Sequence, residues 1–421
     1  MVKSSYEVVV VGGGTAGAVA AIQAARAGAS TLLVEKQGVL GGTMVTGGVA
    51  YPSSFYAHGR QIIAGIGWEL CSRTWQETGE TMTGPDTAPP WMRESERIHH
   101  AVNPAVYAAL ADEALLLAGG DLLFHAMPAA VQRRAGGWSV TLCTKTGLRD
   151  VEAQTLVDCT GDANVVTLAG FEVERSEELQ AATLVVDVEG YDARNLDYKA
   201  IQAAFEREVA AGRMRRTDPG WDNGRIGFFL QSYGGNRIHV PDVDAQTSEG
   251  KTAAEIEGRK VMLRLLRFCR AQPGLGGFRI RWCAPECGIR ETVTIVGKKK
   301  ITIQDYEGGR LWEDAVCYSF YPVDLHRADR LQFRAIGPGI LPTIPLGAML
   351  PAGSGGLVVA GRCIAGDSEA NSAYRVQASC MAMGQAAGAA AALAARLDGD
   401  IEHVPPAQLH ALLRRHGAIV P

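Results

Sequence analysis

A short apolar run that ends in glycines constrains this chain more than any other feature of its sequence. Residues 7–11 are mostly valine, which is typical of a buried parallel strand, and Gly12, Gly14 and Gly17 follow directly. In this spacing the first glycine permits a tight turn from strand to helix, and the second lets the backbone approach a pyrophosphate. The third lets helix and sheet pack closely. A helix is therefore expected over residues 16–27, with its free N–H groups directed at phosphate oxygens.

A second strand, expected over residues 30–35, ends in Glu35. A carboxylate at this place accepts hydrogen bonds from ribose hydroxyls and repels a 2′-phosphate. The alternative is a glycine-rich turn that binds nothing. It is disfavoured, because the strand, the glycines, the helix, the second strand and the terminal acid occur in the required order. The N-terminal segment is thus predicted to bind a dinucleotide.

Composition and charge narrow the class of protein. The chain has 421 residues and a formal net charge of −4, with 47% hydrophobic and 20% charged residues. These values favour a large core over disorder and give no electrostatic reason to expect nucleic acid as a partner. The first residues lack a basic segment followed by an apolar one, so we expect a cytoplasmic protein. Residues 376–395 are uncharged but mostly Ala and Gly, which predicts a closely packed buried helix and no membrane span.

The nine cysteines are scattered along the chain. An odd number does not suit a closed disulfide framework, so reduced thiols are expected. Cys283 and Cys287 have no second Cys or His pair near them in the sequence, and no metal site is expected there.

The remaining elements predict an α/β chain with an insertion. We expect a helix over residues 103–118, strands over 121–131, 138–144 and 149–157, charged helices over 196–211 and 252–270, a strand over 357–360, and a helix from about Arg375. From about residue 175 the pattern changes from apolar strands to charged helical segments separated by loops. A pattern like that of the N-terminal part returns after about residue 330. The expected domains are residues 1–175 for the first part of the nucleotide domain, 176–330 for an inserted substrate or cap domain, and 331–421 for the C-terminal completion.

Three further segments decide between NAD and FAD by resemblance. Residues 38–48 are glycine-rich, residues 156–163 end in Cys-Thr-Gly-Asp-Ala, and residues 356–364 precede an Ala-rich helix. They resemble the segments that FAD proteins of the glutathione-reductase structural class place along the cofactor. The resemblance implies a Rossmann-like FAD/NAD(P)-binding domain with an inserted α+β substrate or cap domain.

A closer resemblance covers most of the chain. Residues 254–260, 288–297 with Asp305, and 321–326 are similar to motifs of the FAD-dependent oxidoreductase family, a distant relative of the fumarate reductase and succinate dehydrogenase flavoproteins. The FAD-binding residues that follow from the glycine motif and these resemblances are Gly12, Gly14, Thr15, Ala16, Gly17, Glu35, Lys36, Gly41, Gly42, Thr43, Val131, Thr160, Gly161, Asp162, Gly361, Asp367, Arg375 and Val376. Covalent attachment in the fumarate reductase relatives uses a His in the glycine-rich stretch. None lies between residues 38 and 55, so non-covalent FAD is expected; His58 is the nearest exception.

The sequence lacks some features that related flavoproteins use. Residues 41–48 contain no cysteine, so the dithiol chemistry of the disulfide reductases is not expected. Residues 175–350 contain no second glycine-rich strand–helix motif, so a separate NAD(P)H-binding domain is not expected. The electron donor or acceptor therefore stays unidentified. Asn371 stands where the family often has His.

Three side chains are candidates for catalysis. Arg290 can fix a carboxylate, although an ion pair with Glu291 or Glu286 is an equally good structural explanation. His326 can act as acid or base, or it is a buried structural histidine. Arg375 can place positive charge near N1–C2=O of the reduced flavin. In addition, Tyr56 and His58 follow the glycine-rich loop, where they face either the substrate or solvent.

These residues support two readings. The first is an enzyme that transfers a hydride between the flavin and a CH–OH or CH–CH unit of a small polar molecule. The second is a flavin-binding subunit of an electron-transfer or modification complex without its own small-molecule substrate. A homo-oligomer is compatible with both.

Overall fold

The computed structural model describes residues 2–81, 84, 86–88, 100–221, 224–327 and 331–421. A seven-stranded sheet forms its centre, in the order β5-β2-β1-β8-β7-β6, with β18 pairing with β8 beside β7. The bounds of these strands are β1 Ser5–Val11, β2 Thr31–Glu35, β5 Asp121–Phe124, β6 Met127–Arg134, β7 Gly137–Thr144, β8 Gly147–Asp158 and β18 Leu357–Val359. The predicted α/β Rossmann-like class is confirmed.

The N-terminal β-α-β unit forms as the glycine motif predicts. Strand β1 runs parallel to β2 on one side and to β8 on the other, and α1 (Thr15–Arg26) connects β1 to β2. All three carboxyl ends therefore meet at one edge of the sheet, which is where parallel sheets bind ligands.

The single strand predicted over residues 121–131 is wrong. The structure has two strands there, because β5 adds to β2 in parallel and β6 then pairs antiparallel with β7. The chain turns between them at His125, whose φ of 56° lies in the left-handed region. That conformation is uncommon for residues other than glycine. Because a histidine adopts it here, the turn has no Gly or Pro to mark it in the sequence.

The Ala-rich segment forms the buried helix that its composition predicts. Helix α11 (Gln377–Ala395) is long and apolar enough to cross a membrane by length and composition, but 89% of its apolar stretch is buried inside the protein. A Cβ at Gly384 would lie 2.1 Å from the carbonyl oxygen of Ala16, and one at Gly388 would lie 2.1 Å from that of Ala20. The helix therefore packs backbone to backbone against α1, which only glycine at these positions allows.

The helix predicted from about Arg375 is confirmed as α11, and a further short helix that the sequence analysis did not predict precedes it. Helix α10 (Ser368–Tyr374) ends just before Arg375, and α11 begins at Gln377 after Val376, which has an extended backbone. Asp367 caps α10 by accepting a hydrogen bond from the N–H of Ala370.

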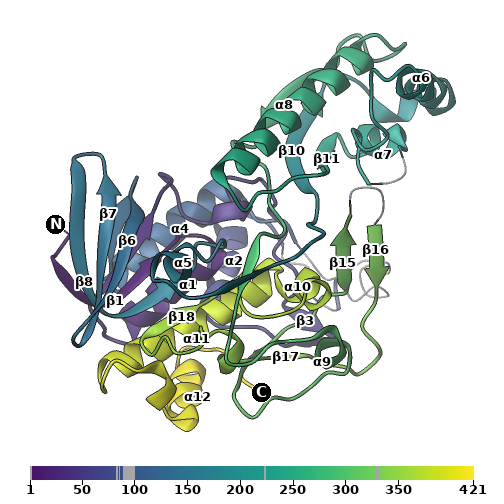
Figure 1. Ribbon diagram of the computed structural model, residues 1–421. Coiled ribbons are helices and arrows are strands. Elements are labelled where there is room, and N and C mark those ends of the chain that lie inside the picture. The colour runs from purple at the N-terminus through teal and green to yellow at the C-terminus, as the bar shows by residue number, and fades with distance from the viewer. Residues whose placement is uncertain (1, 82–83, 85, 89–99, 222–223, 328–330) are drawn as a thin grey trace.

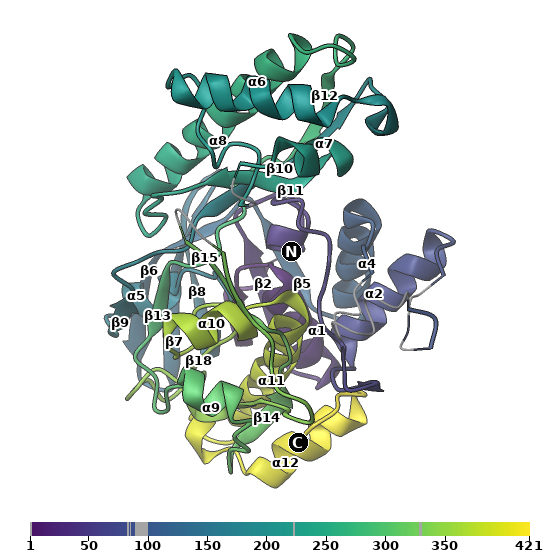
Figure 2. The same cartoon turned by 90° about the vertical axis from the view of Figure 1, so that its right-hand side faces the viewer.

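A second hydrophobic core lies apart from the sheet. It draws on buried residues between Ala182 and Ile289, whereas Val293 and Ile295 pack in the first core, and Ile303, Val323 and Leu325 form a small third cluster. Its elements are β10 Ala182–Glu189, β11 Gly234–Val240, β12 Arg279–Cys283, α6 Tyr198–Ala210, α7 Ile226–Gln231 and α8 Ser248–Arg270. Figures 1 and 2 show these elements at one end of the molecule and α12 at the other. We call this part the cap; the domain limits at residues 175 and 330 stay a prediction.

The other elements lie around the sheet, in the cap and between these two parts. They are η1 Gly42–Met44, β3 Tyr56–Ala57, β4 Arg60–Gln61, α2 Ile66–Glu77, α4 Pro104–Leu117, α5 Asn164–Leu168, β9 Val173–Arg175, η2 Ala193–Asn195, β13 Val293–Ile295, α9 Ile303–Glu307, β14 Ala315–Tyr318, β15 Val323–His326, β16 Leu331–Arg334, β17 Thr343–Pro345, η3 Leu346–Ala348, η4 Ile401–His403 and α12 Pro406–Arg415.

The α1–α11 contact predicts a position-dependent cost of adding one methyl group. Gly388→Ala should lower the free energy of unfolding by about 1–3 kcal/mol, because neither backbone can move without separating the helices. Gly276→Ala is the matched control, since a Cβ there meets nothing within 4 Å. Urea denaturation of both variants measures the difference. Equal stability of the two variants would contradict the packing.

Candidate functional site

The three glycines of the N-terminal motif have three different surroundings. A Cβ at Gly12 would lie 2.5 Å from the carbonyl oxygen of Cys159, and one at Gly17 would lie 1.7 Å from that of Gly12. Gly12 also has a φ of 96°, which favours glycine. A Cβ at Gly14, by contrast, would meet only the Cα of Gly42, at 4.0 Å. Gly12 and Gly17 therefore serve the packing of the chain, while Gly14 borders open space.

We call the space bordered by Gly14 at the start of α1 and by Gly41 of the glycine-rich loop the glycine cradle, and further features of it suit an anion. Gly14 is the N-cap of α1, and no side chain caps that helix. Its first N–H groups thus remain available at the positive end of the helix dipole. Gly14 also forms a bridge with Gly41, so the glycine-rich loop lies directly beside the helix start. Among the described residues, an uncapped helix N-terminus next to a glycine with free space fits the pyrophosphate of a dinucleotide.

Glu35 lies beside the cradle and is 8% exposed. Its Oε2 accepts a hydrogen bond from the N–H of Gly13 (2.6 Å), and its Oε1 accepts one from the N–H of Gln37 (2.7 Å). Each carboxylate oxygen has a further lone pair for a ribose hydroxyl. The residue therefore also orders the glycine loop.

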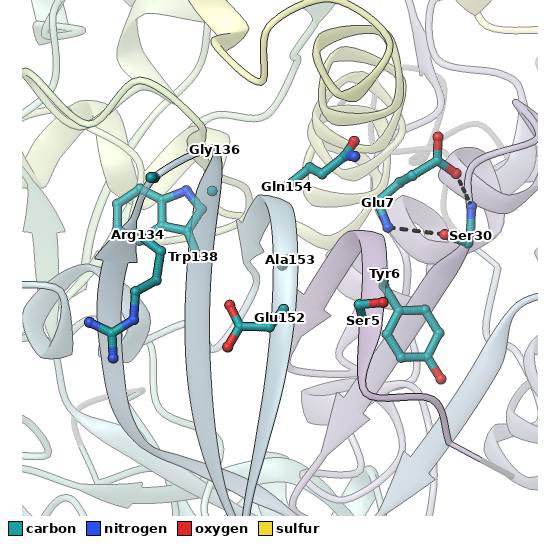
Figure 3. A pocket seen from close by; sticks show the side chains of 12 residues that line it. Ser5, Tyr6, Glu7, Ser30, Arg134, Gly136, Trp138, Glu152, Ala153 and Gln154 are labelled. Carbon is teal, nitrogen blue, oxygen red and sulfur yellow. Dashed lines mark hydrogen bonds between the residues drawn. The ribbon is translucent and has the colours of Figure 1, made fainter.

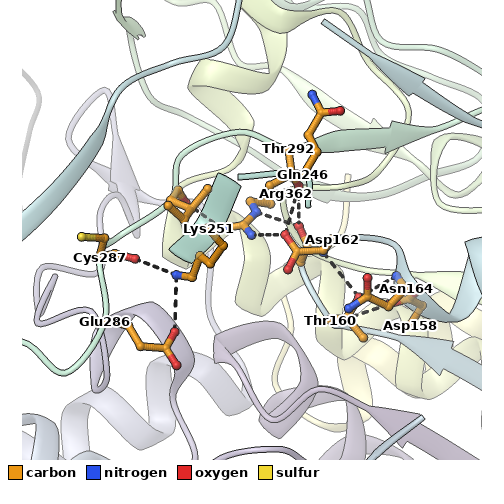
Figure 4. A network of polar contacts seen from close by, with 12 residues as sticks. Asp158, Thr160, Asp162, Asn164, Gln246, Lys251, Glu286, Cys287, Thr292 and Arg362 are labelled. Atoms are coloured by element: carbon orange, nitrogen blue, oxygen red, sulfur yellow. Dashed lines mark hydrogen bonds and ion pairs between the residues drawn. The ribbon is translucent and has the colours of Figure 1, made fainter. Parts of the chain in front are cut away.

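The Thr-Gly-Asp motif follows β8 at the same edge of the sheet. The hydroxyl of Thr160 donates to Asp158 (2.7 Å), and Arg362 donates to the carbonyl of Gly161 (2.6 Å) and to the carboxylate of Asp162 (2.5 Å). Thr292 also donates to Asp162, at 3.1 Å. Figure 4 shows this network. The side chains of Thr160 and Asp162 are therefore engaged within the protein, and the roles of Thr160, Gly161 and Asp162 toward FAD stay predictions.

The remaining predicted FAD residues lie in several places. Gly361 follows β18 with a φ of 105°, and Asp367 accepts hydrogen bonds from the N–H groups of Ile303 and Ala370. Those assigned from position alone are Thr15 and Ala16 at the start of α1, Lys36 after β2, Gly42 and Thr43 in η1, Val131 on β6, and Arg375 and Val376 between α10 and α11. Their roles stay predictions.

The pocket in Figure 3 lies elsewhere. It is lined by the beginning of β1 and by the β6–β7 turn, including Ser5, Tyr6 and Trp138. This is the amino edge of the parallel strands, opposite the glycine cradle, and we assign it no role.

A buried polar cluster lies where the two cores meet, and the segment of Gln180 and Ala181 holds it together. Arg290 donates from Nη1 to the carbonyl of Ala181 (2.6 Å), and Arg375 donates from Nη2 to Oε1 of Gln180 (3.2 Å). The N–H of Ala181 bonds to the carbonyl of His326 (2.8 Å). The structure thus brings together the three predicted catalytic residues, Arg290, His326 and Arg375.

Asp324 and His326 form a pair within this cluster, with Oδ2 and Nε2 3.2 Å apart. Burial and the charge of Arg290 lower the pKa of His326 to about 4. Burial alone would raise the pKa of Asp324, but the hydrogen bond with His326 and the nearby arginines lower it to about 2. At neutral pH the carboxylate is therefore ionised and the imidazole neutral. Because an ionised carboxylate only accepts, Nε2 carries the proton and Nδ1 is an acceptor, for which the described residues supply no donor.

Sequence reasoning missed Gln180 and His239. His239 bonds through Nε2 to the carbonyl of Arg327 (3.2 Å), and its ring centre lies 6.2 Å from that of His326. Burial, then the charge of Arg290, lowers its pKa to about 3. The sequence did contain one indication of His239, because it lies between Ile238 and Val240. A polar residue within an apolar strand is often buried for a structural or functional purpose.

The alternative role for Arg290 as an ion-pair partner of a neighbouring glutamate does not occur in the described residues. Glu291 accepts from Ser176 (2.7 Å) and Gln180 (3.2 Å), and Glu286 lies 3.6 Å from Lys251 (Figure 4). Arg290 itself is 7% exposed.

The two candidates after the glycine-rich loop lie apart from this hydrogen-bond network. Tyr56 packs edge-on against Trp68, and His58 bonds through Nε2 to the carbonyl of Ile340 (2.9 Å).

The cluster adjoins the segments assigned to the flavin. Gln377, the first residue of α11, donates to the carbonyl of Val49 (2.6 Å), and its Oε1 is buried without a partner. A Cβ on Gly48 would lie 2.7 Å from Trp282 of the cap. The glycine-rich loop therefore contacts both the start of α11 and the cap.

The chain matches the family of FAD dependent oxidoreductases over residues 7–413. It therefore belongs to this family, and the protein is an FAD-dependent oxidoreductase enzyme. A comparison with curated proteins finds no match.

The solved structures that this chain matches are distant in sequence. A geranylgeranyl bacteriochlorophyll reductase-like protein from Thermoplasma acidophilum is 13% identical with a TM-score of 0.44, covering 98% of this chain and 83% of that chain. The p-nitrophenol 4-monooxygenase PnpA from Pseudomonas putida is 12% identical with a TM-score of 0.42, covering 97% and 84%. At this distance the likenesses say nothing of the substrate.

The open space at Gly14 predicts that a side chain there removes FAD without unfolding the chain. Gly14→Val should purify without FAD and keep the stability of the FAD-free protein to within about 1 kcal/mol, the scale of an N-cap preference. Gly17→Ala should instead destabilise the fold, because its Cβ has no room. Visible absorbance and thermal melts of the FAD-free proteins separate the two effects. FAD retention by Gly14→Val would show that the cradle is misassigned.

Proposed function

We propose that this enzyme transfers a hydride between a CH–OH or CH–CH unit of a small polar molecule and non-covalently bound FAD. The observation that carries the proposal is the buried cluster of Arg290, Arg375, Asp324 and His326, which adjoins the start of α11 and the Thr-Gly-Asp motif. Perturbed titratable groups gathered between two cores are typical of active sites. The oligomeric state, the cytoplasmic location and the electron partner stay predictions.

FAD, when bound, supplies the acceptor or donor of the hydride. The residues that would hold it are those of the glycine cradle, Glu35, and the backbones of the 160–162 and 375–377 segments. The chain supplies the handling of protons. In the oxidation of an alcohol, the carbon loses a hydride and the hydroxyl loses a proton, which the neutral Nδ1 of His326 accepts as C=O forms. Asp324 is a positioning residue, because it fixes the proton on Nε2.

Non-covalent binding predicts that the flavin leaves the chain on denaturation. The purified protein should be yellow, and acid or heat should release intact FAD into the supernatant. No histidine lies in the glycine-rich stretch, and His58 is engaged with Ile340. Chromatography of the supernatant and the pellet measures the partition. Flavin that stays with the precipitated chain would contradict this prediction.

The enzyme reading predicts that a defined small molecule bleaches the flavin. Under anaerobic conditions, one member of a panel of alcohols, hydroxy acids and saturated acids should remove the visible flavin absorbance. His326→Gln should slow this reduction about 100-fold, the lower range for loss of a general base, while retaining FAD. His403→Gln, an exposed histidine, is the control and should react normally. If no metabolite reduces the flavin and another protein co-purifies stably, the chain is a flavin-binding subunit instead.

A further inference from the structure

The two buried arginines have more hydrogen-bond donors than the described part of the chain satisfies. Each guanidinium carries several N–H groups in a fixed plane and stays protonated at neutral pH. In the described part of the chain they donate to the carbonyls of Ala181 and Asp324 and to Oε1 of Gln180. Nε of Arg375 is fully buried with no partner. An unmatched charged donor in a protein interior destabilises the fold, because its hydrogen bonds to water are lost and not replaced.

The two acidic groups nearby do not meet this demand. Asp324 is engaged with His326, and Glu291 accepts from Ser176 and Gln180. Neither lies within 4.0 Å of an arginine nitrogen as an ion pair, among the residues that the structure describes. Burial and the charge of Arg375 lower the pKa of Arg290 to about 9, so each cation also disfavours the other.

We infer that the substrate carries a carboxylate, which the guanidinium groups of Arg290 and Arg375 bind together. This inference rests on the proposed function, since it names the class of molecule that the same site accepts. A planar carboxylate matches the planar fork of a guanidinium and brings acceptors to donors that otherwise lack them. A single negative charge suits a site that already holds Asp324 and Glu291, whereas a phosphate dianion would be repelled more strongly.

The same geometry places the reacting end of the substrate. Arg290 and His326 both bond to Ala181, one to its carbonyl and the other, through the backbone, to its N–H. The two residues thus belong to one hydrogen-bonded cluster, and we expect a molecule anchored by its carboxylate at Arg290 to direct its next polar group toward the imidazole of His326. Small organic acids with a hydroxyl or a saturated carbon beside the carboxylate fit this arrangement.

Binding, measured apart from turnover, tests the inference on the FAD-loaded wild-type protein. Isothermal titration and the thermal melting midpoint should show binding of acids from the set acetate, malate, succinate and benzoate, and at least 10-fold weaker binding of the matched amides. Inorganic phosphate is a further probe. Equal binding of acid and amide, tighter binding of phosphate than of every carboxylate, or no binding of any carboxylate would overturn the inference.

Variants locate the site. Arg290→Lys keeps the charge but loses the planar fork, so the affinity for the best carboxylate should fall about 10-fold, roughly 1.4 kcal/mol, with FAD retained. Arg281→Lys is the matched control, because Arg281 is exposed and pairs with Asp187. If Arg290→Lys does not fold, the affinity of Arg375→Lys for the same carboxylate provides a second test. Unchanged affinity in a folded variant of either buried arginine would overturn the assignment.

The experiment separates this inference from the proposed function. Flavin bleached by neutral molecules, without any effect of Arg290→Lys, would leave the hydride transfer standing and overturn the carboxylate. Carboxylates that bind through Arg290 while no metabolite reduces the flavin would support the carboxylate and overturn the hydride transfer.

Discussion

The rest of the structure depends on the backbone contact between α1 and α11. Gly384 lies against Ala16 and Gly388 against Ala20, so the two helices are locked at the closest spacing that their backbones allow. Each helix begins at a different part of the proposed FAD site. Helix α1 starts at the glycine cradle, and α11 starts beside Arg375. Because the helices cannot slide, the place for the pyrophosphate and the start of the polar cluster keep a fixed relation.

The cap completes the site through the chain segments that connect it. Gln180 and Ala181 lead into the cap, and the segment of Arg290 leads out of it; both pair with neighbours at the junction. Thr292 then ties the outgoing segment to Asp162 of the Thr-Gly-Asp motif. Residues that are more than a hundred positions apart in sequence therefore meet because the insertion begins and ends at the same place. Such junctions between two cores are common positions for small-molecule sites.

Local patterns predicted the parts of the structure whose cause is local. The order of strand, glycines, helix and acid defined the β-α-β unit, and the small residues of α11 indicated a buried, closely packed helix. The hydrogen bonds that join Gln180 to Glu291 and Arg375 could not be predicted, because they depend on contacts between distant segments. Asp324 and His326 are two residues apart on β15 and share one face of that strand, so their pairing has a local cause that the sequence analysis missed. The turn at His125 and the short helix α10 were missed for another reason. The turn occurs without the glycine or proline that usually marks a change of direction, and α10 is only 7 residues long.

The central claim is that the buried cluster forms the substrate side of the flavin. The most direct test is a crystal structure of the protein with FAD bound. We expect the isoalloxazine ring at the start of α11, with the guanidinium groups of Arg290 and Arg375 and the imidazole of His326 facing the space beside it. A ring bound away from this cluster, or separated from it by protein side chains, would contradict the account.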